Sequence, residues 1–229
     1  MPKVIMSDRI PELITAAEES GFSVVPTDRA EALPIPEQRH ADMQILKIAD
    51  RLFILGCCDG LKDRLTEYDV RVCSKPSGSD YPDNISMNML LFGRKLFGRT
   101  DRIDPLVKEY CEQKGIELVF MKQGYARCTT LVLDNESVIT ADKGVQGVMK
   151  KYGAEALPIS GEGISLPGYD TGFIGGASMV YQNTVYFFGN ASALSDYNKI
   201  KAFCTDRGYK IQSLCPGIPL TDIGGAVIL

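Results

Sequence analysis

Two copies of one short motif constrain the fold of this chain more than any other feature. Ile174-Gly175-Gly176-Ala177 and Ile223-Gly224-Gly225-Ala226 are identical in sequence, and apolar residues follow each copy. After the first copy a turn, a second strand and a helix are expected, whereas the second copy leads directly to Leu229. An apolar strand at a terminus needs a partner that ties it down. We expect this partner to be Lys3-Val4-Ile5-Met6, so that one structural unit is divided between the two ends of the chain.

The whole chain can be divided into five such units of strand, strand, helix and strand. Their starts lie near residues 40, 84, 127, 175 and 223, and the last unit is completed by residues 1–26. The spacing is about 43 to 48 residues and is maintained across the termini, as in repeat architectures. A spacing that closes on itself predicts a ring. We therefore expect one α/β domain over residues 1–229, a five-bladed propeller with pseudo-fivefold symmetry.

Hydrophobic periodicity and turn residues predict the elements of each unit. The expected helices cover residues 9–20, 61–66, 103–114, 143–152 and 192–207. The expected strands cover residues 4–6, 22–25, 43–48, 51–55, 69–73, 87–92, 95–98, 116–121, 128–133, 137–140, 155–159, 177–181, 184–188, 209–214 and 224–229. Glycines follow four of the helices, where a left-handed C-cap is expected. The Pro- and Gly-rich connections between units are expected to be loops of the kind that carry function.

Composition excludes several classes of protein. No apolar run reaches the roughly 20 residues that span a bilayer, and no signal peptide precedes the first strand. The 25 basic and 29 acidic residues include no basic cluster, which argues against a nucleic-acid partner. Seven cysteines without a CxxC pair predict neither a disulfide framework nor a zinc site, and favour a reduced, cytoplasmic protein. The single histidine, His40, makes a metal site a poor expectation, and no cofactor is indicated.

Five strand-strand-helix-strand units in a closed ring resemble the pentein superfamily, the five-bladed α/β propellers. Its members include arginine and agmatine deiminases, dimethylarginine dimethylaminohydrolase, amidinotransferases and a non-catalytic ribosome anti-association factor. The resemblance implies a central channel whose functional residues come from the blade starts. His40-Ala41-Asp42 is similar to the His-x-Asp blade start of the deiminases, in which the Asp contacts the substrate guanidinium. His40 is thereby expected to be the catalytic base and Asp42 a substrate ligand; a capping or surface role for His40 is the alternative.

The segment Gly124-Tyr125-Ala126-Arg127-Cys128-Thr129-Thr130 resembles the stretch that carries the nucleophilic cysteine of the deiminases. Cys128 lies two repeats after His40, as the family pattern requires, and is expected to be the nucleophile. The alternative is a small buried strand residue, which is the usual fate of a free cysteine. Cys57, Cys58 and Cys215 are rival reactive thiols at loop edges. Two other residues at blade starts, Arg127 and Asn84, are expected to contact the substrate.

The orienting acid of the family belongs to a Glu-Gly-Gly-Asp blade start. The corresponding segment here runs from Asp222 to Ala226, with Ile223 in place of the Glu. Asp222 is the expected catalytic acid, but it lies one residue early, and on a strand this shift would turn its side chain to the opposite face. Asp170 is the nearest carboxylate to the blade that starts at 175 and is expected to bind substrate. For both aspartates local turn chemistry is the alternative.

Together these residues predict a Cys-dependent hydrolase, or a related enzyme, acting on a small guanidino or amidino compound in the central channel through a covalent thiol intermediate. The departure from the Glu-Gly-Gly-Asp pattern favours the alternative, a non-catalytic ring that binds a metabolite or a macromolecular partner. The sequence leaves the substrate and the oligomeric state open.

Overall fold

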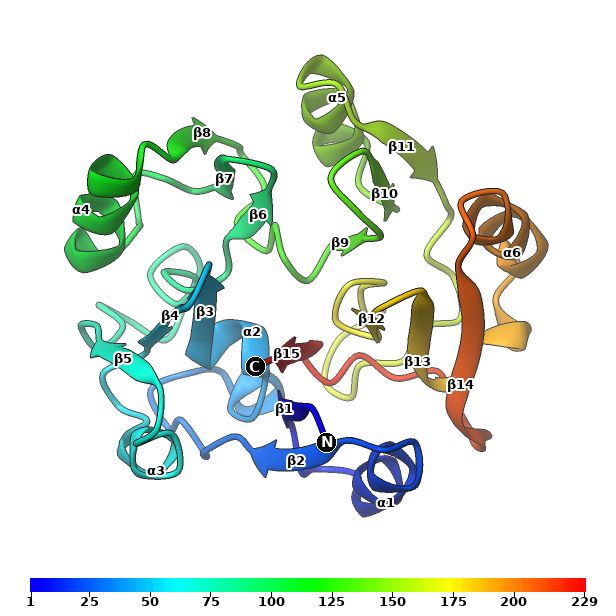
Figure 1. The fold of residues 1–229 in the computed structure, drawn as a ribbon, viewed down its shortest axis with the longest axis horizontal. Helices are drawn as coiled ribbons and strands as arrows, with labels where there is room; N and C mark the ends of the chain where they lie inside the picture. Colours follow the sequence, from blue (N-terminus) through cyan, green and yellow to red (C-terminus); the bar gives the residue numbers. More distant parts are fainter.

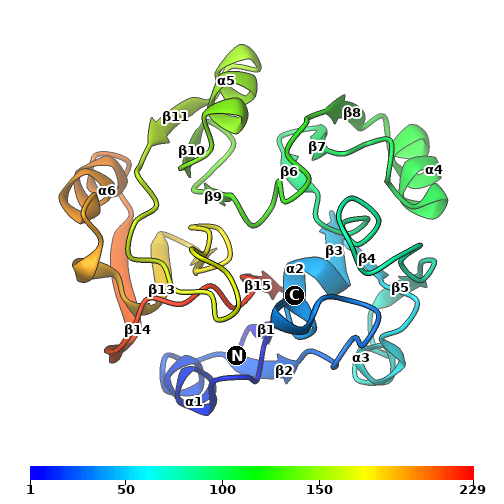
Figure 2. The same cartoon turned by 180° about the vertical axis from the view of Figure 1, so that it is seen from behind.

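The five predicted units form a ring of five small sheets. A computed structural model describes the whole chain, residues 1–229, and in Figures 1 and 2 the sheets surround a common centre while the longer helices lie at the rim. Each sheet has three strands. In ring order the sheets are β15 (Ala226–Ile228), β1 (Lys3–Met6) and β2 (Ser23–Pro26); β3 (Ile45–Ile48), β4 (Arg51–Ile54) and β5 (Asp69–Val72); β6 (Leu90–Phe92), β7 (Lys95–Gly98) and β8 (Glu117–Phe120); β9 (Thr130–Val132), β10 (Ser137–Thr140) and β11 (Glu155–Pro158); β12 (Ser178–Tyr181), β13 (Thr184–Asn190) and β14 (Lys210–Pro219).

All five sheets have the same topology. The first strand pairs antiparallel with the second, and the second pairs parallel with the third. A parallel pair needs a crossover connection, and in each unit a helix provides it. These crossover helices are α1 (Pro11–Glu19), α3 (Asp59–Asp63), α4 (Pro105–Lys114), α5 (Lys143–Lys151) and α6 (Tyr197–Thr205). The fold is therefore the predicted five-bladed ββαβ propeller.

The divided blade is confirmed. Strand β15 pairs antiparallel with β1, with Val4 opposite Ile228 and Met6 opposite Ala226. Figure 1 shows the C-terminal strand beside the blue N-terminal strand near the centre of the ring. Both termini are thus held by strand pairing, which accounts for an apolar segment at the end of the chain.

Buried side chains lie mainly at the junctions between blades. The largest of four hydrophobic clusters has 23 buried residues and joins the blades of β3 and β6. The other three join the blades of β6 and β9, of β9 and β12, and of β12 and β15. Because each blade buries apolar surface against its neighbours, the blade starts at the centre are held in a fixed arrangement.

Local chemistry explains where the helices begin and end. In α4 the Asp104 carboxylate accepts a hydrogen bond from the Leu106 amide at 2.9 Å, Pro105 is the first helical residue, and Gly115 closes the helix in the left-handed conformation. In α5 the Asp142 carboxylate caps the Val145 amide at 2.8 Å. No helix is long and apolar enough to cross a membrane.

Several of the predicted elements needed correction. The helix expected over 192–207 is a short 3-10 turn, η2 (Ala191–Ala193), followed by α6. The Asn190 side chain caps the start of η2 at the Ser192 amide, and the extended backbone of Leu194 ends it. The strand expected over 209–214 continues to Pro219 as β14. This strand lies at the edge of its sheet, where prolines are tolerated because no second neighbouring strand needs their missing N–H groups.

The other corrections concern the blade starts. The strand expected from residue 43 begins at Ile45, after a short helix, α2 (Ala41–Gln44), which itself follows a 3-10 turn, η1 (Ile35–Glu37). The strand expected from residue 87 begins at Leu90, and the strand expected from Cys128 begins at Thr130. In these blades the residues with candidate chemistry therefore lie before the inner strand, and their side chains do not follow strand alternation.

Candidate active site

Cys128 lies in the turn that leads into β9, at the centre of the ring. The Asn88 side chain, from the turn before β6, shapes this turn, because its oxygen accepts hydrogen bonds from the amides of Arg127 at 2.9 Å and Cys128 at 3.3 Å. Its amide nitrogen donates to the Cys128 sulfur at 2.9 Å. Gly175 packs against the backbone of the same turn, and a Cβ there would lie 2.7 Å from the Cys128 carbonyl oxygen. The cysteine is therefore held by two neighbouring blades.

Asp42 is the second partner of the Cys128 thiol. The thiol donates to Asp42 Oδ2 at 2.8 Å, and both residues are only 3 % exposed. Burial, followed by the charges of Asp42 and Asp222, raises the pKa of the Cys128 thiol well above its usual range. Burial also raises the pKa of the Asp42 carboxyl, and the charge of Asp222 adds to this effect. With these neighbours Cys128 is therefore a neutral thiol at pH 7.

His40 is buried beside the divided blade. It is the residue before α2 and is 3 % exposed. Gly224, with a φ of +80°, lies directly against it, and a Cβ at this glycine would be 2.3 Å from the His40 Cβ. Burial, with a smaller contribution from the charge of Arg9, lowers the pKa of His40 to about 3. His40 is thus a neutral imidazole at pH 7 and forms no hydrogen bond with Cys128.

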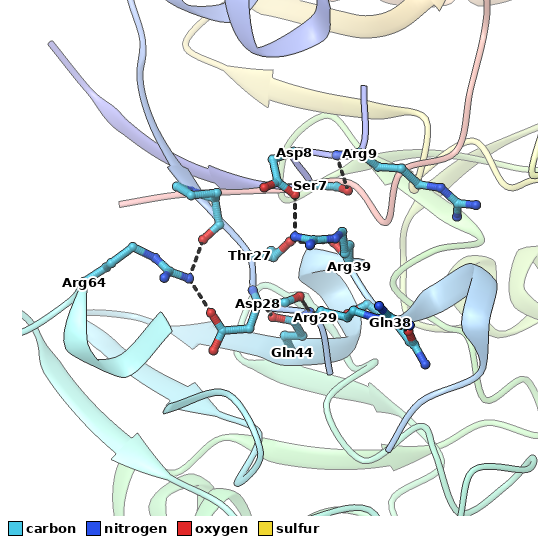
Figure 3. A network of polar contacts seen from close by, with 11 residues as sticks. Ser7, Asp8, Arg9, Thr27, Asp28, Arg29, Gln38, Arg39, Gln44 and Arg64 are labelled. Carbon is cyan, nitrogen blue, oxygen red and sulfur yellow. Dashed lines mark hydrogen bonds and ion pairs between the residues drawn. The ribbon is translucent and has the colours of Figure 1, made fainter. Parts of the chain in front are cut away.

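A polar network holds the segment that carries His40 (Figure 3). The fully buried Gln44 amide donates to the main-chain oxygens of Asp28 and Gln38, both at 2.7 Å. The Gln44 side-chain oxygen in turn accepts from the Asp28 amide at 3.0 Å. Further contacts of the network join Thr27 to Arg39, Arg39 to Asp8, and Arg64 to Asp28. The long connection from β2 to α2 is consequently fixed over residues 27–44.

Asp222 lies in the turn before β15 and not on the strand. Its carboxylate accepts from the amides of Gly224 and Phe173, each at 2.9 Å. Gly176 of the neighbouring blade leaves room for it, since a Cβ there would lie 1.9 Å from Asp222 Oδ1. The adjoining Ile223 packs into a hydrophobic cluster between blades. Burial raises the pKa of Asp222 to about 6 in spite of the two amide donors.

Glu37 is a third buried acid and was missed by the sequence analysis. Its Oε1 accepts from the hydroxyls of Tyr169 at 2.5 Å and Tyr125 at 3.1 Å, and its Oε2 accepts from the Asn84 amide at 3.1 Å. Burial raises the pKa of the Glu37 carboxyl, although these three donors oppose the shift. Glu37 thus joins the segment 27–44 to two other parts of the ring.

These residues surround one small pocket of about 200 Å³. His40, Cys128 and Asp222, the three predicted catalytic residues, all line it. Asp42 lies behind the Cys128 sulfur, and the structure places Asn84 behind Glu37. The full lining consists of Glu37, His40, Met43, Tyr125, Cys128, Leu166, Tyr169, Thr171, Phe173 and Asp222. It contains two acids and no lysine or arginine, which makes the pocket suited to a small cation.

None of the four predicted substrate ligands lines this pocket: Asp42 and Asn84 lie directly behind it, and the other two lie further away. Asp170 is exposed and outside the pocket, whereas its neighbours Tyr169 and Thr171 line it. Arg127 lines a larger pocket of about 440 Å³, which also includes Asp42. Asp42 and Cys128 therefore lie where the two pockets meet.

A finer alignment of the blade starts could have identified Asn88. Cys128, Asn88 and Gly224 each lie two residues before an inner strand. We placed that blade start at Asn84, four residues early, because the strand was expected from residue 87. No sequence signal of this kind marks Glu37, which lies between repeats. In addition, no group of three or more His, Cys, Asp and Glu side chains is arranged to hold a metal ion.

One family model covers almost the whole chain. Residues 5–227 match a family described as "Family of unknown function (DUF6873)". The chain belongs to this family. No curated protein matches the sequence.

Solved structures show the same fold at low sequence identity. Dimethylarginine dimethylaminohydrolase from Pseudomonas aeruginosa, in a complex with citrulline, superposes with a TM-score of 0.57 at 10% identity over 99% of this chain and 98% of that chain. The N-terminal domain of a cyanobacterial arginine dihydrolase gives 0.59 at 11% identity, over 99% and 95%. An amidinotransferase of saxitoxin biosynthesis from Microseira wollei gives 0.57 at 12% identity, over 93% and 88%. These proteins are pentein-superfamily members, and this DUF6873 chain has the pentein fold.

Proposed function

We propose that this protein is a Cys-dependent enzyme that acts on a small guanidino or amidino cation. One observation carries the proposal: Cys128, His40 and Asp222, drawn from three different blades, line a single pocket of about 200 Å³ at the centre of the ring. The solved structures with the same fold include enzymes that act on arginine and dimethylarginine. A thiol, an imidazole and carboxylates in one buried site are the groups that nucleophilic substitution at a guanidinium carbon requires.

The charge of the substrate has a second role in this proposal. Cys128 is a neutral thiol beside Asp42 because burial and the nearby acids raise its pKa. A guanidinium ion beside the sulfur would oppose both effects, since an opposite charge favours the ionised form. Glu37 and Asp222 attract this cation, and its planar N–H groups match carboxylate oxygens. The substrate would thus lower the pKa of its own nucleophile.

The proposed reaction has two stages, formation of a covalent intermediate on Cys128 and its hydrolysis. The Cys128 proton passes to the neutral His40 imidazole while the sulfur forms a bond to the guanidinium carbon. The imidazolium gives this proton to one substrate nitrogen, the carbon–nitrogen bond breaks and an amine leaves. His40 then takes a proton from water, the resulting hydroxide adds to the same carbon, and the carbon–sulfur bond breaks. The ureido carbonyl forms as the hydroxyl proton is lost to solvent, where it protonates the released amine, and the imidazolium returns its proton to the Cys128 sulfur. The products are a ureido compound and an ammonium ion.

A second reading, a non-catalytic ring that binds a cationic metabolite, rests on a different observation. The Cys128 sulfur is hydrogen-bonded to Asp42 and Asn88, and no hydrogen bond joins it to His40. In the proposed enzyme the thiol turns from Asp42 toward His40 when a cation binds. In a binding protein the thiol would keep its hydrogen bond to Asp42 when the cation binds.

A turnover assay separates the two readings. Purified protein is incubated with a panel of small guanidino and amidino compounds, and released amine and ureido product are measured together. We expect turnover of at least one compound, loss of at least 1,000-fold in Cys128→Ser, and a similar loss in His40→Gln. Cys57→Ser, a half-buried cysteine outside the pocket, is the matched control and should retain activity.

The products and the binding data together distinguish a hydrolase from a binding protein. Release of amine and ureido product in equal amounts supports the hydrolase. Saturable binding of a guanidino compound without product, at the same affinity in wild type and Cys128→Ser, supports the binding protein and contradicts the enzyme. Activity that survives Cys128→Ser would also contradict the proposal.

A further inference from the structure

The second and larger pocket of the ring contains two cations that have no anionic partner. This pocket, of about 440 Å³, is lined by 18 residues, of which 14 are hydrophobic and two are the cations Lys47 and Arg127. Neither cation takes part in an ion pair. The Lys47 ammonium donates only to the Ile228 carbonyl at 2.8 Å, and one Arg127 guanidinium nitrogen reaches the Ala226 carbonyl at 3.5 Å. Both side chains are half-buried.

The walls of this pocket come from the inner strands of the ring. They are contributed by β3, β6, β9, β12 and β15, which surround the centre in Figures 1 and 2. Along β3 the lining runs from Ile45 to Ala49, which corresponds to about 13 Å at ~3.3 Å per residue. The lining is thus mostly apolar, with Arg127 and Asp42 just before the inner strands and Lys47 further along β3.

Charge complementarity identifies the kind of ligand. Half-buried cations are costly to leave without a counter-ion, and hydrogen bonds to charged groups are among the stronger ones. Asp42 is the only acid in the lining, and its Oδ2 already accepts from Cys128. The other oxygen, Asp42 Oδ1, is buried without a hydrogen-bond partner, so no hydrogen bond joins this carboxyl to Arg127. The two cations are therefore open to an anionic ligand, and the apolar walls favour an apolar body.

We propose that this pocket is a second ligand site, which binds an amphipathic carboxylate with its head group on Arg127 and its apolar chain along the inner strands. Lys47 lies along the same wall and adds to the attraction. A pocket of this size and lining falls within the range of small-molecule sites. The proposal does not depend on the chemistry of the Cys128 pocket.

Calorimetric titration with three probes of equal length tests the proposal. Octanoate, 1-octanol and octylammonium share one apolar chain and differ in charge. We expect octanoate to bind at least tenfold more tightly than octanol, because only the carboxylate forms charge-assisted hydrogen bonds, and octylammonium to bind more weakly than octanol. Equal affinity of octanol and octanoate would overturn the proposal. So would the absence of octanoate binding up to about 10 mM.

Variants locate the site. Arg127→Gln should weaken octanoate binding at least tenfold and Lys47→Met by about threefold, whereas Lys62→Met, an exposed lysine on α3, should leave it unchanged. If circular dichroism shows that Arg127→Gln does not fold, Val180→Asp provides the second test, because a carboxylate on β12 should reverse the preference toward octylammonium. Octanoate affinity that is unchanged in Lys47→Met and in either of the other two pocket variants would contradict the assignment.

Discussion

Substitution of Gly224 by alanine tests how tightly the divided blade packs against His40. This glycine has a φ of +80°, and an added Cβ would lie 2.3 Å from the His40 Cβ and 2.4 Å from its Cα. Both atoms are close to the backbone, so a change of rotamer cannot relieve the contact. Either His40 and the start of α2 move, or the turn before β15 opens.

The magnitude follows from two separate effects. A non-glycine residue in the left-handed region costs roughly 1–2 kcal/mol, and inserting a methyl group into a packed interior typically costs about 1–3 kcal/mol. The free energy of unfolding should therefore fall by about 2–5 kcal/mol in Gly224→Ala. For a chain of this size each 1 kcal/mol lowers Tm by about 2–4 °C. The expected decrease is roughly 5–20 °C.

Two other glycines separate these effects. Gly21 has a φ of +92° with nothing within 4 Å of an added Cβ, so Gly21→Ala should show only the backbone cost of about 1–2 kcal/mol. Gly147 lies within α5, also in open space, and Gly147→Ala should stabilise the protein by about 0.5–1 kcal/mol. Urea unfolding followed by circular dichroism measures all three. If Gly224→Ala is no more harmful than Gly21→Ala, the described packing of His40 is refuted.

Three further predictions concern the pH dependence and the closure of the ring. The raised pKa of Asp222 lowers the free energy of unfolding by about 3 kcal/mol as pH rises from about 4 to 6, and the lowered pKa of His40 lowers it as pH falls from about 6.5 to 3. In His40→Gln only the Asp222 effect remains, so urea unfolding should show stability that falls as pH rises. In Asp222→Asn only the His40 effect remains, so stability should fall as pH decreases; profiles identical to wild type would contradict both assignments. Iodoacetamide should modify Cys128 more slowly at pH 7 than a thiol of ordinary pKa, with the rate rising only above about pH 9, and mass spectrometry of the labelled peptide measures this. Deletion of residues 226–229 removes β15, the pairing partner of β1, and should abolish the cooperative thermal transition; a truncated chain with an unchanged Tm would show that the ring does not need this strand.

Most of the fold could be predicted from the sequence because the repeats carry it. The two Ile-Gly-Gly-Ala motifs and the constant spacing identify the five blades, including the one divided between the termini. Strand ends were less accurate at Cys128 and at residue 43. At Cys128 the Asn88 oxygen binds two main-chain amides that a strand would otherwise pair. Before β3 the Gln44 side chain binds main-chain groups of Asp28 and Gln38 and so holds α2 against the segment before it. Long-range contacts of this kind leave no periodic signal.

The residues of the candidate site that lie at blade starts could be predicted from the sequence. His40, Cys128 and Asp222 were identified from their positions in the repeat, and the structure places all three around one pocket. The shift of Asp222 by one residue does not turn it away, because this residue lies in a turn, where strand alternation does not apply. Glu37 could not be identified, because it lies between repeats and reaches the pocket through the fixed segment 27–44. Asp170 shows the opposite error, since closeness in sequence to a blade start did not bring it into the pocket.

The most direct test of the central claim compares two electrophiles of nearly equal shape, the cation 2-chloroacetamidine and the neutral 2-chloroacetamide. Both alkylate thiols with loss of chloride, and the ratio of their rates with glutathione corrects for intrinsic reactivity. If the pocket binds a guanidino or amidino cation beside Cys128, peptide mapping at pH 7 should find the amidine on Cys128. Its preference over the amide should exceed that of glutathione at least tenfold, which corresponds to about 1.4 kcal/mol of attraction by the buried acids. A preference equal to that of glutathione, or labelling of Cys57 and Cys215 by the amidine before Cys128, would contradict the account.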